Sequence, residues 1–130
     1  MREIKFRAWD NEEKWMVDDL YISFDGDIFT DDVDPHDTPY REMELADAER
    51  YELMQYTGED DLELHPIYEG DIVHIYDEEP YMTVDMLDVV IFKNGCFTTK
   101  EHEYDFYHCG GDCLTVKGNI YENPELLKGD

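Results

Sequence analysis

The chain has 130 residues, of which 35 are Asp or Glu and 10 are Lys or Arg, so its formal net charge is −25. Such a field repels nucleic acid and anionic membranes and attracts basic surfaces. Hydrophobic residues make up 42% of the chain, enough for the core of one compact domain. Since no apolar run approaches the roughly 20 residues of a membrane span and residues 1–5 lack a signal-peptide pattern, we expect a cytoplasmic protein.

Strands are the first elements that the pattern predicts. Residues 4–9 alternate between two faces, as a β-strand does. Residues 15–24 indicate a second strand, which Asp25-Gly26 connects to a third at 27–30 in the manner of a tight hairpin. Residues 31–39 hold two prolines and four acids with almost no apolar residue, so they are predicted to be a loop. The N-terminal part is therefore expected to be a β-meander.

The middle of the chain is less regular. Residues 40–50 are ambiguous, and we place a short helix there because Leu45 and its neighbours favour one. Residues 51–56 alternate and predict a strand, which we expect Gly58 to end. Residues 59–61 are then predicted to form an acidic turn.

The later chain predicts a small antiparallel barrel or curled sheet. Asn94-Gly95 is a strong signal for a type I′ hairpin. Asn123, Pro124 and Glu125 match a helix N-cap, first position and first turn, so residues 125–128 are predicted to form one helical turn. The predicted strands are residues 71–77, 82–93, 96–100 and 114–121.

No set of residues with catalytic spacing stands out, so we expect no enzyme and no cofactor. The three cysteines, Cys96, Cys109 and Cys113, cannot all pair within one chain, and a reducing compartment would keep them as thiols. His108, Cys109 and Cys113 are weak candidates for a zinc site, because a Cys-x3-Cys spacing occurs without a second cysteine pair. Thiols in a glycine turn are the favoured interpretation, and no metal is predicted.

Four stretches carry a family resemblance. They are Ile-Lys-Phe-Arg-Ala-Trp-Asp at 4–10, Leu-Met-Gln-Tyr-Thr-Gly at 53–58, Ile-Tyr-Glu-Gly-Asp-Ile-Val at 67–73, and Gly-Asn-Ile-Tyr-Glu-Asn-Pro-Glu-Leu-Leu at 118–127. In this order they resemble the YopX family of phage and prophage proteins. The resemblance implies a β-rich fold with an SH3-like barrel in the C-terminal part, a viral or prophage origin with residence in the bacterial host cytoplasm, and a tendency to self-associate. It implies no activity.

The fold expected from pattern and resemblance together is mainly β, of the α+β kind. Residues 1–58 would form an N-terminal β-rich subdomain with a short helix and the acid-rich loop at 31–39. Residues 59–130 would form the C-terminal SH3-like barrel and the terminal helical turn. The stretch between the second and third motifs departs from the family, since relatives usually carry a lysine-bearing turn there and this chain has Glu-Asp-Asp-Leu-Glu-Leu-His-Pro at 59–66.

The negative charge is concentrated in the middle of the sequence. Residues 31–88 contain 20 acids and 2 bases, against 8 and 4 in residues 1–30 and 7 and 4 in residues 89–130. Spread evenly over roughly 7,000 Å², a net charge of −25 is about one per 290 Å², whereas duplex DNA presents roughly one per 110 Å². If the middle segment covers a third to a half of the surface, its net charge of −18 has a density of about one charge per 130 to 190 Å².

The function predicted from this charge is that of a phage accessory protein. Its acidic surface would bind a basic, nucleic-acid-binding site on a host or phage protein, as a DNA-mimic inhibitor, with no nucleic acid or membrane bound directly. The alternative is a self-assembling structural module whose acids serve solubility, and a homo-oligomer is expected. The residues predicted to make the acidic surface are Asp31, Asp32, Asp34, Asp37, Glu59, Asp60, Asp61, Glu63, Glu78 and Glu79.

Overall fold

The computed structural model describes residues 3–18, 20–30, 44–45, 49–78, 80, 82–104, 106 and 112–128. Strands dominate this part of the chain, and its last element is a short 3₁₀ helix, so the predicted mainly β fold is confirmed. The chain divides into two compact units. The N-terminal unit comprises Phe6–Met54, and the C-terminal unit comprises Met1–Lys5 and Gln55–Asp130.

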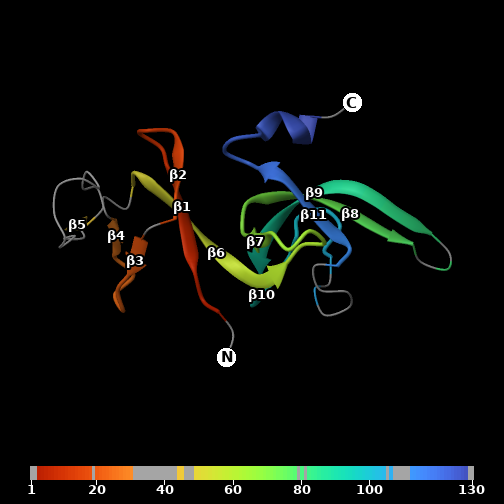
Figure 1. Cartoon of the computed structure of the whole chain (residues 1–130), viewed down its shortest axis with the longest axis horizontal. Helices are drawn as coiled ribbons and strands as arrows, with labels where there is room; N and C mark the ends of the chain where they lie inside the picture. Colours follow the sequence, from red (N-terminus) through yellow and green to blue (C-terminus); the bar gives the residue numbers. More distant parts are fainter. Residues whose placement is uncertain are drawn as a thin grey trace. The chain divides into compact units, whose positions relative to one another are not determined.

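The N-terminal unit is built from short antiparallel strands (Figure 1). Strand β1 (Phe6–Asp10) pairs with β2 (Trp15–Val17). Strands β3 (Leu20–Ile22), β4 (Ile28–Thr30) and β5 (Glu44–Leu45) form a three-stranded sheet in that order. The antiparallel strands of the predicted meander are present, but they are divided between two sheets. The predicted strand at 15–24 is two strands, because β2 pairs with β1 whereas β3 pairs with β4.

The short helix predicted at residues 40–50 is wrong where the structure describes that segment. Glu44 and Leu45 form strand β5, and they lie opposite Thr30 and Phe29 of β4. Pairing with a neighbouring strand outweighs the helix propensity of Leu45. Residues 40–43 and 46–48 lie outside the described residues.

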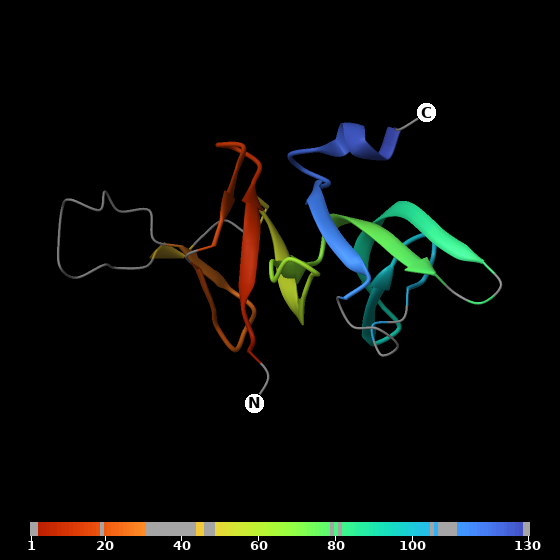
Figure 2. The same cartoon turned by 45° about the vertical axis from the view of Figure 1, so that its right-hand side comes forward.

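A curled four-stranded antiparallel sheet dominates the C-terminal unit. Its order is β10-β9-β8-β11, and β8 and β9 are its two long central strands (Figures 1 and 2). Before it in sequence, β6 pairs with β7. The elements are β6 (Tyr51–Asp60), β7 (Pro66–Tyr68), β8 (Asp71–Glu78), β9 (Thr83–Lys93), β10 (Cys96–Thr99), β11 (Leu114–Asn119) and the 3₁₀ helix η1 (Pro124–Lys128).

The core of this unit lies on one face of the curled sheet. Along β8, Val73 and Ile75 are fully buried, whereas His74 and Tyr76 are more exposed. This is expected because successive side chains of a strand point to opposite faces of the sheet. The buried cluster consists of Ile67, Val73, Ile75, Val84, Val90, Tyr104 and Leu114. The sheet thus has a second face of polar and half-exposed side chains.

The strand predictions for residues 71–121 are confirmed to within a few residues at each end. Asn94 and Gly95 have φ of 54° and 82°, as a type I′ turn requires, and they connect Lys93 to its partner Cys96. The predicted C-terminal helical turn is confirmed as η1. Among the described residues, no helix has the length and apolarity that a membrane crossing would need.

The predicted end of β6 at Gly58 is wrong. The strand continues to Asp60, and the chain turns at 61–65 instead of 59–61. Gly58 has φ of 90°, and the pairing with β7 is irregular between Tyr56 and Asp60. The glycine therefore supplies the backbone conformation of a bulge within the strand.

Candidate functional site

The acidic loop, defined as residues 59–65, comprises the last two residues of β6 and the turn to β7, and it is organised around one inward-facing carboxylate. The Asp61 side chain is 0% exposed. Its Oδ1 accepts hydrogen bonds from the backbone N–H of Glu63 at 2.9 Å and of His65 at 2.8 Å. Its Oδ2 accepts one from Val116 of β11 at 2.9 Å. Asp61 therefore ties the loop to the curled sheet.

Burial and hydrogen bonding oppose each other at Asp61. Burial raises the pKa of its carboxyl, whereas the hydrogen bonds from Val116, His65 and Glu63 and the nearby His65 ring lower it, and the net pKa lies below the ordinary value. Asp61 is thus a charged group within the fold. Its assignment to the partner-binding surface is corrected, because a side chain that is 0% exposed offers no oxygen to a partner.

Three other predicted surface residues of this loop do face solvent. Glu59 and Asp60 at the end of β6 are exposed, and so is Glu63 in the turn. Asp60 accepts a hydrogen bond of 2.6 Å from the hydroxyl of Tyr56, which holds that carboxylate in place. The structure therefore brings Glu59, Asp60 and Glu63 together on one anchored loop.

Of the remaining predicted residues, the structure describes Glu78. Glu78 is exposed at the far end of β8, where its Oε1 accepts a hydrogen bond of 2.7 Å from the hydroxyl of Tyr76. The others, Asp31, Asp32, Asp34, Asp37 and Glu79, lie outside the described residues.

Two further aspartates of the acidic segment are buried. Asp71 Oδ2 accepts a hydrogen bond of 2.8 Å from the backbone N–H of Tyr68. Asp88 accepts hydrogen bonds from the N–H groups of Val89 at 2.8 Å and His102 at 2.8 Å. Residues 55–88 contain 11 acids and no Lys or Arg. Three of these 11 acids, Asp61, Asp71 and Asp88, hold loops in place and contribute no exposed carboxylate.

A similar arrangement in the N-terminal unit includes a cation. Asp10 is 1% exposed, and its carboxylate accepts hydrogen bonds from Arg50 Nε at 2.9 Å and Nη2 at 2.7 Å. The N–H groups of Glu12 and Glu13 bond the same Oδ1 at 2.9 and 3.2 Å. The hydrogen bond from Arg50 is the main reason that the pKa of Asp10 falls from 3.8 to about 2.

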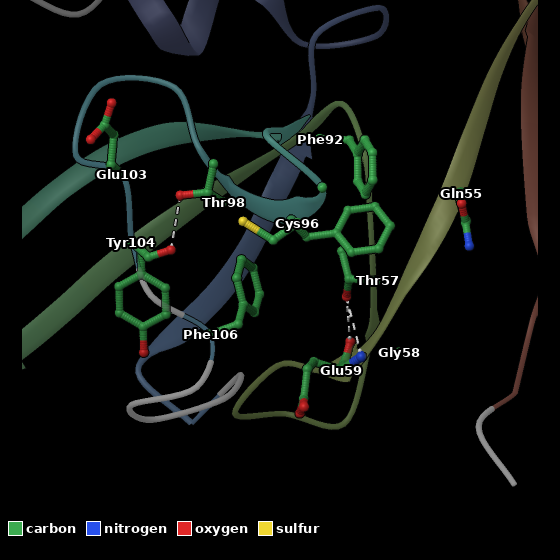
Figure 3. Close-up of a pocket in the computed structure, with 12 residues that line it drawn as sticks. Gln55, Thr57, Gly58, Glu59, Phe92, Cys96, Thr98, Glu103, Tyr104 and Phe106 are labelled. Carbon is green, nitrogen blue, oxygen red and sulfur yellow. Dashed lines mark hydrogen bonds between the residues drawn. The ribbon is translucent and has the colours of Figure 1, made fainter.

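An open pocket of about 850 Å³ lies in the C-terminal unit, next to the acidic loop (Figure 3). Aromatic rings make much of its wall. Phe92 and Phe97 meet edge to face with centroids 5.1 Å apart, and Tyr104 and Phe106 do so at 5.6 Å. Glu59 and Glu103 also line the pocket, and Figure 3 shows them on opposite sides of the rings.

Short polar contacts fix the walls of this pocket. Thr98 Oγ1 donates a hydrogen bond of 3.0 Å to the carbonyl oxygen of Tyr104. The N–H of Tyr104 donates one of the same length to Thr99 Oγ1. On the opposite wall, the N–H of Glu59 donates to Thr57 Oγ1 at 3.2 Å. The sequence reasoning missed the pocket, although the Asn94-Gly95 hairpin implies that Phe92 lies opposite Phe97.

The cysteines differ from the expectation that all remain thiols. Cys113 is disulfide-bonded, and Cys96 is free and exposed in the pocket wall. A disulfide sulfur is not a thiolate ligand, so Cys113 is removed from the weak zinc candidates. His108 and Cys109 lie outside the described residues. Within the part of the chain that the structure describes, no group of three His, Cys, Asp or Glu residues is placed to hold a metal ion.

The chain is similar to known proteins over almost its whole length. Residues 5–128 match the family described as YopX protein. Protein EF1440 from Enterococcus faecalis has a crystal structure with 30% sequence identity and a TM-score of 0.67, and the match covers 98% of this chain and 99% of that chain. Protein yopX from Bacillus subtilis has 24% identity and a TM-score of 0.62, with 100% and 99% covered. No curated protein matches this chain.

Proposed function

Because the chain belongs to the YopX family, we propose that it is a phage accessory protein of that family which acts by binding and not by catalysis. Its acidic surface would occupy a basic, nucleic-acid-binding site on a host or phage protein. Loop carboxylates pair with arginine in the same bidentate geometry as phosphate does, so they can replace nucleic acid at such a site.

The observation that carries this proposal is the anchored acidic loop. Asp61 is held by three backbone N–H groups, and this fixes the segment from which Glu59, Asp60 and Glu63 face solvent. A loop that is already ordered loses little conformational entropy when a partner binds its charged side chains. The loop is therefore suited to present carboxylates at fixed positions.

The surroundings of the loop favour a basic partner as well. The segment 55–88 contains no Lys or Arg that would neutralise these acids. His65 Nδ1 lies 3.9 Å from Glu63 Oε2, and Lys5 Nζ lies 4.5 Å from the ring centroid of Tyr56, whose hydroxyl donates to Asp60. Because acids outnumber cations around the loop, they leave a negative potential that steers a basic surface toward it, and salt weakens this attraction.

Charge reversal on the loop tests the proposal. We compare the wild type with Glu59→Lys combined with Glu63→Lys, two exposed positions whose side chains are not part of the core. The matched control reverses Asp112 and Glu125, which are exposed acids of the same unit outside the loop. Each double variant changes the net charge by the same amount. Asp61 is left unchanged, because its replacement would release the loop.

The readout is capture from a Bacillus subtilis lysate on immobilised protein at 50 and 500 mM salt. We expect DNA-binding proteins to be retained at low salt, to be released by added duplex DNA, and to be lost with the loop variant but kept with the control. Capture that is unaffected by salt, or equal for the loop variant and the wild type, would contradict the proposal.

One observation favours self-assembly as a second candidate. Strand β10 is at the edge of the four-stranded order β10-β9-β8-β11, and an edge strand can pair with another copy of the chain. Sedimentation velocity separates the candidates. A stable oligomer that persists in the loop variant would support a structural module.

A further inference from the structure

The geometry points to a specific occupant for the open pocket: we infer that it binds an arginine side chain on an extended segment of the basic partner. This inference rests on the proposed function. It adds a site at which one partner residue is recognised by shape as well as by charge. The pocket lies beside the acidic loop and shares Glu59 with it, so both would be covered by the same partner.

The first argument is the exposure of the aromatic rings. Phe92 is 54% exposed near the end of β9, after the buried stretch that ends at Val90. Phe92 and Phe97 stand outside the buried cluster of the unit, so the core does not account for their position. Aromatic faces attract cations, and the planar guanidinium of arginine stacks on them better than an ammonium group does.

The second argument is the charge at the rim. Glu59 and Glu103 both line the pocket and are both exposed. Glu103 is paired with Lys93 at 3.4 Å, whereas no described cation lies within 4.0 Å of the Glu59 carboxylate. A guanidinium lying on the rings could therefore pair with Glu59. The site lacks a cation of its own at that end, and a partner's arginine would supply it.

The third argument is size and polarity. A pocket of about 850 Å³ is within the range of ligand sites, and it is wide enough for an arginine together with parts of its flanking residues. Gln55, Thr57 and Thr98 provide neutral hydrogen-bonding groups in the wall. Such groups suit the backbone of an extended segment, whose N–H and C=O groups need partners when they leave water.

The experiment uses a fluorescein-labelled nine-residue peptide with three arginines separated by glycine and serine. Two matched peptides replace every arginine by lysine, which keeps the charge, or by citrulline, which keeps the planar shape without the charge. Fluorescence anisotropy gives the affinity of each peptide for the full chain. We expect the arginine peptide to bind at least 3-fold more tightly than the lysine peptide and the citrulline peptide to show no measurable binding.

Variants assign this preference to the pocket. We expect Phe92→Ala to weaken the arginine peptide about 5-fold, to the level of the lysine peptide, and Phe92→Leu, which keeps the apolar volume, to weaken it as well. Tyr76→Ala is the matched control, because Tyr76 is a 47% exposed aromatic residue of the same sheet outside the pocket. Circular dichroism checks that each variant folds.

The outcomes separate this inference from the proposed function. If arginine and lysine peptides bind equally and Phe92→Ala changes neither, the pocket inference fails while the acidic surface stands. If neither peptide binds at low salt, both fail. If sedimentation shows an oligomer that Phe92→Ala dissociates, a second copy of the chain covers the pocket, and the arginine segment is excluded.

Discussion

Among the residues that the structure describes, four aspartates are nearly fully buried, and each is a structural carboxylate. Asp10, Asp61, Asp71 and Asp88 are between 1% and 2% exposed. Each accepts at least one hydrogen bond from a backbone N–H group near a turn. A carboxylate that leaves water needs such donors to offset its lost hydration. The number of acidic residues therefore overstates the charge that a partner can reach.

The pH dependence of stability tests the role of Asp10. Its pKa is about 2 in the folded protein against 3.8 ordinarily, so the ionised form stabilises the fold above pH 4 and this contribution is lost as pH falls toward 2. A shift of this size corresponds to about 2 kcal/mol. We expect Asp10→Asn to lower the free energy of unfolding by about that amount at pH 7. Urea denaturation at pH 7, 5, 4 and 3 measures it.

The control for this prediction is Glu12→Gln. Glu12 also pairs with Arg50, at 3.4 Å, but its side chain is 70% exposed, so we expect little change in stability. The difference between wild type and Asp10→Asn should be constant above pH 4 and shrink below it. A difference that stays the same down to pH 3, or an equal loss in both variants, would contradict the assignment.

Asp60 and Asp61 show what a local sequence pattern cannot predict. Asp60 and Asp61 are adjacent and chemically identical, and both were predicted to be on the surface. Which of them turns inward is decided by Val116, 55 residues away, whose N–H meets Asp61. No local pattern contains that contact. The exposure of Glu59 and Glu63, in contrast, agrees with their place beside a polar turn.

At the scale of elements, the end of β11 depends on a close approach to a glycine. A methyl group at Gly118 would lie 2.7 Å from Cγ of Asn123. Asn123 precedes η1, and its Oδ1 accepts a hydrogen bond of 3.2 Å from the N–H of Asn119. Asn119 Oδ1 in turn accepts hydrogen bonds from the N–H groups of Tyr121 and Glu122. These contacts explain why glycine and two asparagines occur together in the fourth motif.

A comparison of two glycines tests this explanation. We expect Gly118→Ala to destabilise the protein by about 2 kcal/mol, because the side chain of Asn123 must move and release its hydrogen bond. Gly95→Ala should cost about 1 kcal/mol through its φ of 82° alone, since nothing lies within 4 Å of the added methyl group. Thermal and urea denaturation give the two values.

Hydrogen exchange distinguishes the two causes. Only Gly118→Ala should accelerate exchange in residues 119–128, where the turn and η1 lie. If both variants exchange equally in residues 119–128, the close packing of Asn123 on Gly118 does not stabilise the C-terminal turn.

The elements could be predicted where a pattern is local. The alternation of residues along the chain predicts the bounds of β8 to β11 closely, and the Asn94-Gly95 turn predicts that β9 pairs with β10. The sequence could not show whether Gly58 ends a strand or forms a bulge, because glycine supplies a positive φ equally well at both. The pocket combines Phe92 and Phe97, whose pairing follows from the hairpin, with Tyr104 and Phe106. The last two come from a connection without periodicity, so the sequence could not place them.

At the scale of the whole molecule, the negative charge is shared by the two units. The C-terminal unit contains 19 acids and 6 bases, and the N-terminal unit contains 16 and 4. The acidic segment 31–88 is thus divided between them at Met54. A net charge of −25 over 9162 Å² is about one per 370 Å², well below the density of duplex DNA, roughly one per 110 Å². The proposed recognition by charge would therefore depend on a local group of acids, such as that on the acidic loop.

The overall charge leads to a prediction about salt. Repulsion among the exposed acids destabilises the compact state, and added salt screens it within a Debye length of about 8 Å at 0.15 M. We expect the midpoint of thermal unfolding to rise by several degrees between 10 and 200 mM NaCl at pH 7. Calorimetry measures the midpoint.

Tetramethylammonium chloride at the same ionic strength is the control for a specific effect of sodium. The rise should be equal in both salts if screening is the cause. An unchanged or falling midpoint would show that attractive pairs, such as Asp10 with Arg50, outweigh the repulsion.

Strand β6 has a consequence for how this protein can be divided. It extends from Tyr51 to Asp60, and the limit between the two units falls inside it, after Met54. Tyr51 belongs to the buried cluster of the N-terminal unit, whereas Tyr56 pairs with Tyr68 in the C-terminal unit. A gene fragment that stops anywhere in this stretch encodes a broken strand. An expression boundary for either half therefore belongs before residue 51 or after residue 60, with the whole of β6 assigned to one fragment.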